Sequence, residues 1–181
     1  KIDDWLQWLT PKDCLFRIYR DARRLQDGDP IYKQNRWFVL SPWGKNSSLP
    51  GYYVHIEPWN KSFFWGWVYR PEPDHLRSLR EYFAKHGDSY KKILKTASFK
   101  KAFWQPTGTS LTRPPKWFTP DTPHLDLIQQ KQHLIYAPIT DKELLETEDF
   151  VALITNYVKL AYPWMHFLTQ GCLYKKSHDS N

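Results

Sequence analysis

Two segments of the sequence alternate polar and apolar side chains, and this alternation limits the folds open to the chain more than any other feature. The first reads LFRIYRDAR over residues 15–23, and the second reads YYVHIEP over residues 52–58. Successive side chains of a β-strand point to opposite faces of its sheet. If the two segments are neighbouring strands, one face builds a core and the other collects ionisable groups and tyrosines. That second face is a candidate ligand-binding face.

The first half of the chain is predicted to form an antiparallel sheet of about four strands. The predicted strands cover residues 14–20, 36–41, 52–57 and 62–70, with turn-forming residues between them. From Asp74 onward the apolar residues follow helical spacing, and further helices are predicted at 121–133 and 149–168. Strands first and helices second predict an α+β fold, with C-terminal helices covering the sheet. Residues 1–174 are predicted to be a single domain and residues 175–181 a disordered tail.

Capping residues predict where several helices begin. Asp88 and Ser98 are predicted N-caps of two shorter helices, and Thr140 with Glu143 forms a predicted capping box. Pro163 is predicted to kink the last helix or to end it early, because proline cannot donate the helical hydrogen bond.

The chain is basic and rich in aromatic residues. Its formal net charge is +7, and aromatic residues make up 17% of it, with 10 Trp. Positive charge favours anionic partners. An excess of aromatic rings predicts that some lie at a surface, a cleft or an interface. A core that uses Trp and Tyr in place of Leu and Ile is the alternative.

The remaining composition gives no sign of a metal site, a cofactor or a membrane span. Cys14 and Cys172 match no zinc or CxxC spacing, which predicts the cytoplasm or another reducing compartment such as an organelle matrix. One disulfide between them is the alternative. The histidines show no HxH or HExxH spacing and there is no Gly-rich phosphate loop, so no metal and no cofactor are predicted. The longest apolar stretch, residues 150–168, contains Asn156 and Lys159 and is predicted to be a buried helix.

Three segments of the chain are similar to a known protein family. They are RIYRD at residues 17–21, followed by Arg23, Pro30, Tyr32 and Lys33; GYYVHIEP at residues 51–58; and LTRPPKWF at residues 111–118, which contains Arg113. Occurring in this order across more than half of the chain, they resemble the motifs of a bacterial conserved-hypothetical family, domain of unknown function 2461.

The resemblance implies a family but no activity, because that family has no established biochemical function. Residues 26–33 (QDGDPIYK) carry an acidic turn where family members carry a basic one. The helical region that precedes the first strand in the family is nearly absent here. The resemblance therefore predicts a diverged, N-terminally shortened member, retained as a binding or assembly protein or as an enzyme.

Ionisable residues of the two alternating segments form a candidate catalytic site. Tyr19, His55 and Glu57 are the candidate catalytic residues, because a carboxylate two residues along a strand can orient an imidazole while a tyrosine donates a proton. Arginine holds phosphate or carboxylate groups bidentately. The alternative is a structural ion-pair network on the sheet. The predicted ligand-binding residues of this type are Arg17, Arg20, Arg23, Lys33 and Arg113.

A row of aromatic residues is the second candidate binding surface. Trp65, Trp67 and Tyr69 follow Phe63 on one face of the strand predicted at 62–70, as in proteins that stack the bases of single-stranded nucleic acids. The alternative is that this row packs under the helices. Four more tryptophans lie beside prolines or at element ends and are predicted contacts for protein partners: Trp43, Trp59, Trp104 and Trp117.

The function that the sequence favours is non-catalytic binding of an anionic partner by the polar, aromatic-rich sheet face. That partner is a nucleic acid or a phosphorylated ligand. An enzyme performing acid–base chemistry on a small anionic substrate is one alternative. A structural subunit of a larger protein assembly is another.

Overall fold

The computed structural model describes residues 4–68 and 71–174 of the 181-residue chain. Four strands form one antiparallel sheet in the order β1-β2-β3-β4. They are β1 (Arg36–Leu40), β2 (Gly51–Ile56), β3 (Ser62–Val68) and β4 (His133–Ile139). The helices are η1 (Asp4–Leu6), α1 (Pro11–Cys14), η2 (Ala22–Arg24), α2 (Pro73–Lys95), α3 (Ala97–Ala102), α4 (Leu125–Ile128), α5 (Asp141–Glu146) and α6 (Phe150–Cys172).

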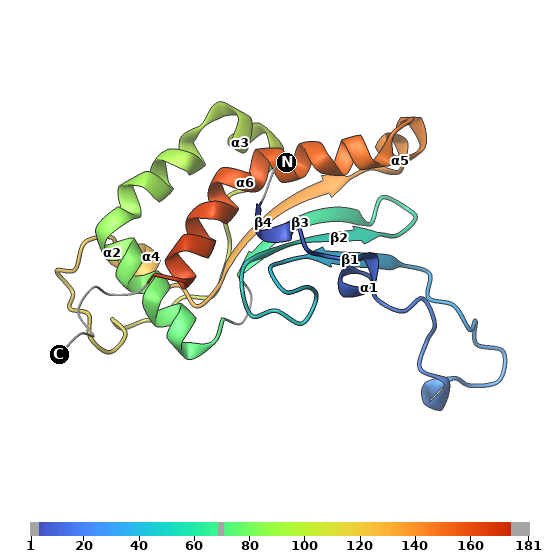
Figure 1. The fold of residues 1–181 in the computed structure, drawn as a ribbon, viewed down its shortest axis with the longest axis horizontal. Coiled ribbons are helices and arrows are strands. Elements are labelled where there is room, and N and C mark those ends of the chain that lie inside the picture. The colour runs from blue at the N-terminus through green and yellow to red at the C-terminus, as the bar shows by residue number, and fades with distance from the viewer. Residues whose placement is uncertain (1–3, 69–70, 175–181) are drawn as a thin grey trace.

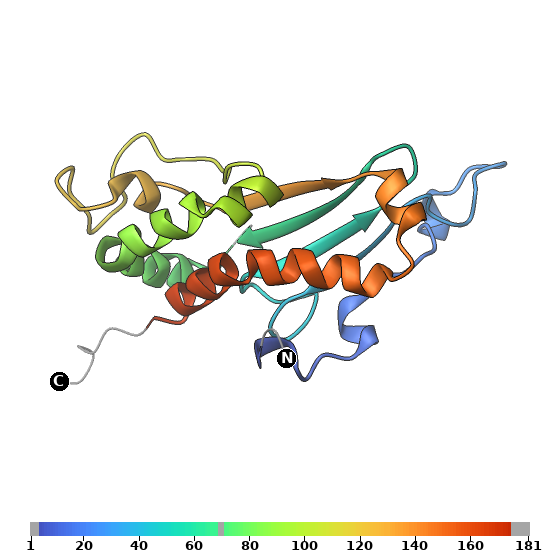
Figure 2. The same ribbon diagram turned by 90° about the horizontal axis from the view of Figure 1, so that it is seen from above.

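The predicted α+β class is confirmed, with the helices α2, α3 and α6 packed against one face of the sheet (Figures 1 and 2). The strands predicted at 36–41, 52–57 and 62–70 correspond to β1, β2 and β3. The strand predicted at 62–70 ends with residues 69–70, which lie outside the described residues. The predicted tail at 175–181 also lies outside them.

The strand predicted at 14–20 is wrong. Residues up to Cys14 form α1, and Leu15 then makes only an isolated bridge to Phe38 of β1. Farther along, the segment pairs with its own continuation, since Arg20 N–H donates to Ile31 O at 2.9 Å. A period-two pattern shows which side chains share a face but not which segment provides the hydrogen-bonding partner.

Of the helix predicted at 121–133, only α4 is helical. β4 begins at the last residue of that range, His133. β4 reads HLIYAPI, a short apolar run that periodicity alone cannot distinguish from helix. The strand pairs with β3 along its whole length, from Val68 opposite His133 to Ser62 opposite Ile139.

The helix boundaries differ at three places from those predicted. Ser98 lies inside α3, whose N-cap is Thr96, so Ser98 caps no helix. α2 runs unbroken through Asp88, which therefore caps no helix. α6 contains Pro163 in its interior and continues to Cys172. The capping box at Thr140 and Glu143 is confirmed, because the Glu143 N–H donates to the Thr140 hydroxyl and the Thr140 N–H to the Glu143 carboxylate.

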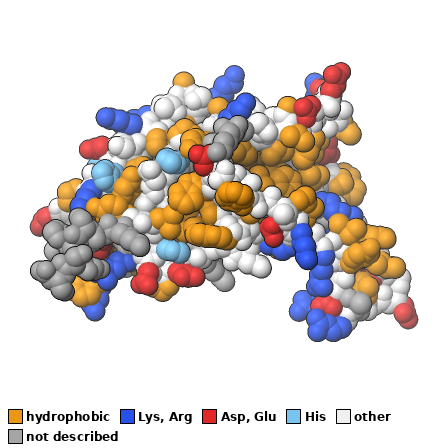
Figure 3. Space-filling view, in the orientation of Figure 1, with side chains coloured by type: hydrophobic (Ala, Val, Ile, Leu, Met, Phe, Trp, Pro, Cys, Tyr) orange, Lys and Arg blue, Asp and Glu red, His pale blue; other side chains and the backbone are white. Residues whose placement is uncertain are grey.

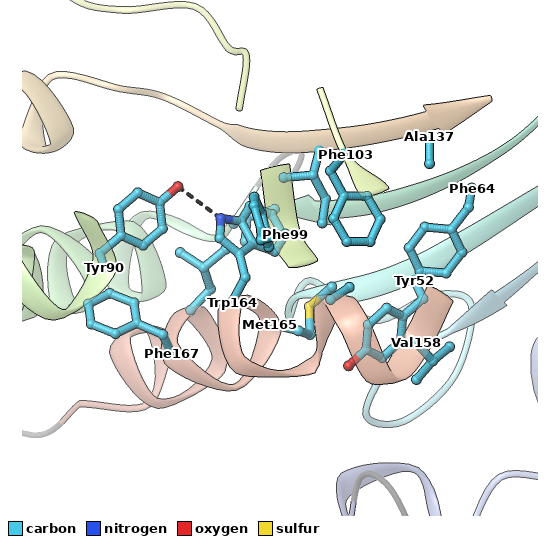
Figure 4. Close-up of a cluster of buried hydrophobic side chains, with 14 of the residues drawn as sticks. Tyr52, Phe64, Tyr90, Phe99, Phe103, Ala137, Val158, Trp164, Met165 and Phe167 are labelled. Atoms are coloured by element: carbon cyan, nitrogen blue, oxygen red, sulfur yellow. Dashed lines mark hydrogen bonds between the residues drawn. The ribbon is translucent and has the colours of Figure 1, made fainter. Parts of the chain in front are cut away.

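The core lies between the sheet and the helices α2, α3 and α6 (Figure 4). Gly66 of β3 permits this close approach, since a Cβ atom there would lie 3.0 Å from the Trp164 ring of α6. Trp164 is fully buried, and its indole N–H donates to the Tyr90 hydroxyl of α2 at 3.0 Å. The sheet contributes to this core from alternate positions only: Tyr52, Val54, Phe64, Val68, Ile135, Ala137 and Ile139.

Candidate functional site

The other face of the sheet carries a nearly continuous layer of rings, and we call it the open face. On β3 the burial alternates strictly, with Phe63, Trp65 and Trp67 half-buried and the residues between them buried in the core. The strand register places these rings beside those of the neighbouring strands. The rings of the open face are Trp37, Tyr53, His55, Phe63, Trp65, Trp67 and Tyr136.

The rings of the open face lean against one another across the strands. The centroid of Phe63 lies 4.8 Å from that of His55 and 4.8 Å from that of Trp65. Tyr53 lies 5.8 Å from Trp65 and 5.6 Å from Trp67. These are the separations at which aromatic pairs attract one another. The layer is therefore held in place by its own side chains.

A chain of hydrogen bonds runs along β2 within this layer. Glu57 Oε2 lies 2.9 Å from His55 Nε2, and the Tyr53 hydroxyl lies 3.1 Å from His55 Nδ1. An ionised carboxylate only accepts hydrogen bonds, so Nε2 carries the imidazole proton. In the neutral ring Nδ1 then accepts from the Tyr53 hydroxyl. The order of donation is Tyr53 to His55 to Glu57.

The surroundings of this chain change the acidity of its two ends in opposite directions. The hydrogen bond from His55 lowers the pKa of Glu57, and Lys61, 3.3 Å from its other oxygen, lowers it further. Burial raises the pKa of Tyr53 to about 12. At neutral pH Glu57 is therefore ionised and Tyr53 keeps its proton.

Next to the open face, at the β1 edge of the sheet, lies a cleft lined by cations. Its larger part is a cavity of about 510 Å³ lined by Arg17, Arg20, Asp21, Arg24, Leu25 and Lys33. A second cavity of about 150 Å³ shares Arg20 and Lys33 with the first and reaches Gln34, Asn35 and Glu57. We call the two together the basic cleft.

The acidic side chains bordering the basic cleft already have partners. Asp21 pairs with Arg23 at 2.9 Å, and the Arg23 side chain is 87% exposed and does not line the cleft. Glu57 is held by His55 and Lys61. The cleft therefore presents an excess of positive charge from Arg17, Arg20, Arg24 and Lys33.

Lys33 connects the basic cleft to the open face. Its ammonium group lies 4.1 Å from the centre of the Trp37 ring, a cation–π contact. Trp37 in turn stacks beside His55, with centroids 6.1 Å apart and planes 9° apart. A ligand bound in the cleft would thus border the first ring of the aromatic layer.

The structure brings together some of the predicted site residues and separates others. Arg17, Arg20 and Lys33 line one cleft that Glu57 borders, as the sequence led us to expect of a binding site. Tyr19 stacks instead on Tyr32, with centroids 5.2 Å apart, and the hydroxyl bonded to His55 belongs to Tyr53.

Three other predicted site residues lie away from the cleft or outside the described chain. Arg23 pairs with Asp21 and does not line the cleft. Arg113 belongs to a loop at the end of the molecule opposite the 17–33 segment, as both ribbon views show (Figures 1 and 2). Tyr69 lies outside the described residues. Trp65 and Trp67 do lie on the open face.

Sequence reasoning missed three residues of this region. Tyr53 shares a strand face with His55 and Glu57, so the alternation that selected those two also indicated it. Arg24 and Asn35 carried no such signal, because Arg24 ends the short helix η2 and Asn35 lies in an irregular segment, and the pattern predicts the course of neither. They complete the basic cleft from its two sides.

The predicted exposure of four tryptophans is observed, and the described residues offer no metal or membrane site. Trp43, Trp59, Trp104 and Trp117 are all exposed, although no partner is thereby identified. Within residues 4–68 and 71–174 no cluster of three metal-ligating side chains occurs. In the same part of the chain, no helix has the length and apolar character needed to cross a bilayer.

The fold and the site together define an α+β protein with a helix-covered sheet face, an aromatic open face and a basic cleft at the sheet edge. The sequence model of a conserved hypothetical protein family, DUF2461, matches residues 1–167, so the chain belongs to that family. No curated protein and no solved structure matches the chain.

Proposed function

We propose that the protein binds an anionic, phosphate-bearing partner in the basic cleft and does so without catalysing a reaction. The observation that carries the proposal is the convergence of Arg17, Arg20, Arg24 and Lys33 on one cavity in which the acidic group, Asp21, is already paired. Guanidinium groups bind phosphate oxygens bidentately and retain their charge at all physiological pH values.

Two further observations support the cleft as the binding site. Three segments carry the family resemblance. Two of them, residues 17–33 and 51–58, contribute side chains to the cleft. The formal net charge of +7 attracts an anion toward the protein from a distance. The cytoplasm or another reducing compartment remains the predicted location, and both cysteines are free thiols in the structure.

The test compares an arginine of the cleft with an arginine far from it. Arg20 borders both cavities of the cleft, whereas Arg113 is exposed in a loop at the opposite end of the molecule. Binding of pyrophosphate and of a short single-stranded oligonucleotide is measured by calorimetry at low and moderate salt. We expect Arg20→Gln to weaken binding by about 10-fold and Arg113→Gln by less than about 2-fold.

The two variants change the net charge equally, so they separate a defined site from general electrostatic attraction. For the oligonucleotide, loss of one phosphate contact is also expected to reduce the slope of log K against log salt by about 0.7 in Arg20→Gln alone. Equal weakening in both variants, or no binding of either anion by the wild-type protein at about 50 mM salt, would overturn the proposal.

A second candidate function, acid–base chemistry on a small anionic substrate, is favoured by the Tyr53–His55–Glu57 chain. Glu57 is the member of the chain that borders the basic cleft, and its lowered pKa keeps it ionised at neutral pH. A substrate held by Arg20 and Lys33 would lie beside this carboxylate. The bonded imidazole of His55 would hold the carboxylate in place.

This second function is tested by separating turnover from binding. Phosphorylated sugars and nucleotides that bind the cleft are incubated with the protein and followed by phosphorus and proton NMR. A reaction catalysed by the wild-type protein and abolished in Glu57→Gln, with binding retained, would establish it. Unchanged spectra for every compound that binds would exclude it for that panel.

A further inference from the structure

We propose that the partner is a single-stranded nucleic acid, with a phosphate in the basic cleft and its bases stacked across the open face as far as Trp104 at the β4 edge. This inference rests on the proposed function, because it takes the cleft as the phosphate site. It commits to one occupant of the aromatic layer. Mononucleotides, protein partners and a second copy of the chain are outcomes of the test below.

The strand register arranges the rings in two adjacent rows, one beginning beside the basic cleft and the other ending at the far edge of the sheet. Trp37 lies opposite His55, and His55 lies opposite Phe63. In the next row, Tyr53 lies opposite Trp65, and Trp65 opposite Tyr136. Strands are about 4.8 Å apart, so the four strands span about 14 Å.

Trp104 closes this series at the β4 edge. Its ring lies 4.6 Å from that of Tyr136, and its backbone N–H donates to the Tyr136 carbonyl at 2.9 Å. The side chain nevertheless remains 63% exposed. Trp104 is thus held against the layer by its backbone while its ring stays available to a ligand.

The shape of the open face suits a strand of bases better than a single small molecule. Small-molecule sites are concave and surround their ligand, whereas this layer is built from side chains standing on one face of a sheet. An extended row of aromatic side chains can instead stack one base after another, and each base contributes separately. Domains that stack two or three bases on a four-stranded sheet use the same arrangement.

Charge favours a polyanion over a protein partner at this face. The cations of the basic cleft lie at one end of the rows, and Lys33 sits directly on the first ring. The polar groups within the layer already bond to one another, since Tyr53 and Glu57 both pair with His55. A base covering Tyr53, His55 and Glu57 would therefore not leave these three groups without a hydrogen-bonding partner.

The helix-bearing side provides a contrasting surface with exposed tryptophans but the opposite charge. Figure 3 shows hydrophobic side chains gathered near the middle of that side. A hollow of about 730 Å³ there is lined by Trp5, Trp8, Trp43 and the acidic residues Asp4 and Asp13. Carboxylates repel phosphate, so this hollow is not expected to bind nucleic acid, and Trp8, 83% exposed, supplies a matched control.

The experiment measures how affinity depends on oligonucleotide length. Thymidine 5′-monophosphate and thymidylate oligomers of increasing length compete with a labelled octamer in fluorescence anisotropy at about 50 mM salt. We expect affinity to rise with each nucleotide up to about four, because two or three bases stack beyond the phosphate in the cleft. Trp104→Ala should weaken the tetramer by about 10-fold and leave the monophosphate unchanged, and Trp8→Ala should change neither.

The outcomes separate this inference from the proposed function. If the monophosphate binds as tightly as the tetramer and Trp104→Ala has no effect, the cleft binds phosphate but the open face binds no bases, and the inference is wrong. If nothing of any length binds, the proposed function fails with it. If the wild-type protein sediments as a dimer that Trp104→Ala dissociates, the open face is an interface between copies and the inference is again wrong.

Discussion

Both faces of the sheet carry aromatic residues, but the residues of one face are buried and those of the other are partly exposed. Phe64 is fully buried beneath the helices, whereas Trp65, the next residue of β3, stands half-exposed on the open face. Each face also contains a tyrosine–histidine pair. Tyr90 contacts His133 within the core, and Tyr53 contacts His55 on the open face.

The difference shows that aromatic content alone does not indicate which residues contribute most to the free energy of unfolding. On the helix-covered face, rings exclude water and fill volume against Trp164 and its neighbours. On the open face, rings are held by one another and keep a surface that a ligand can use. We therefore expect the first face to determine folding and the second to determine binding.

The largest expected effect comes from shortening neighbouring side chains of β3 that point to opposite faces. Phe64→Ala removes a fully buried ring and leaves a cavity, so we expect it to lower the free energy of unfolding by about 3–5 kcal/mol. Trp65→Ala removes a half-exposed ring, and its cost should be about half as large or less. Urea unfolding followed by circular dichroism measures both.

If Trp65→Ala were as destabilising as Phe64→Ala, the two faces would contribute equally to the free energy of unfolding and the comparison would be wrong. The open face would then be a second core. The opposite pattern is expected for oligonucleotide binding, where Trp65→Ala should weaken affinity. Phe64→Ala is measured only under conditions in which circular dichroism shows it to be folded.

The second prediction concerns the pH dependence that the buried His133 gives to the helix-covered face. Burial lowers the pKa of His133 from 6.5 to about 3, with a further contribution from the charge of Arg80. Between these values the unfolded chain binds a proton that the folded protein does not. The free energy of unfolding therefore falls as the pH drops below about 6.5, by up to about 1.4 kcal/mol per pH unit.

The measurement is urea unfolding between pH 5 and pH 7, above the range in which carboxylates titrate. His133→Gln should flatten the dependence, and His86→Gln, which changes an exposed histidine of α2, should leave it as in the wild-type protein. A wild-type stability that does not change from pH 7 to pH 5 would show that His133 is protonated in the folded state.

The sequence predicted the two faces of β2 and β3 correctly but did not reveal which one the helices cover. Alternation assigns Phe63 and Trp65 to one face and Phe64 to the other, whichever face is buried. Both sets are apolar, so hydrophobicity does not decide between them. Gly66 lies on the covered face, where a Cβ atom would be 2.8 Å from Ile135 of β4 and 3.0 Å from Trp164 of α6, contacts between residues far apart in the chain.

The sequence indicated which side chains could bind an anion, because arginine and lysine always carry positive charge. It did not indicate where the backbone places them. Arg17, Arg20 and Lys33 were selected as anion-binding groups, and they line one cavity. That cavity forms because the segment folds back on itself beyond the β1 edge, which its strand-like alternation did not indicate. The same misassigned strand gave Tyr19 a place beside His55 that Tyr53 occupies.

The smallest expected effect comes from removing one hydroxyl from each tyrosine–histidine pair. Tyr90→Phe leaves the buried indole N–H of Trp164 and the buried Nδ1 of His133 without their partner, so we expect a loss of about 1–2 kcal/mol in the free energy of unfolding. Tyr53→Phe removes a hydroxyl from a half-buried side chain, beside a His55 side chain that is 11% exposed, so water has some access and we expect a smaller loss than for Tyr90→Phe. Thermal and urea unfolding of the two variants, made in the same background, measure the difference.

Equal losses would mean that water does not reach the open face and that the two faces are alike in their polar contacts. A measurable loss for Tyr90→Phe alone would show that the same hydroxyl stabilises the fold only where the helices exclude water.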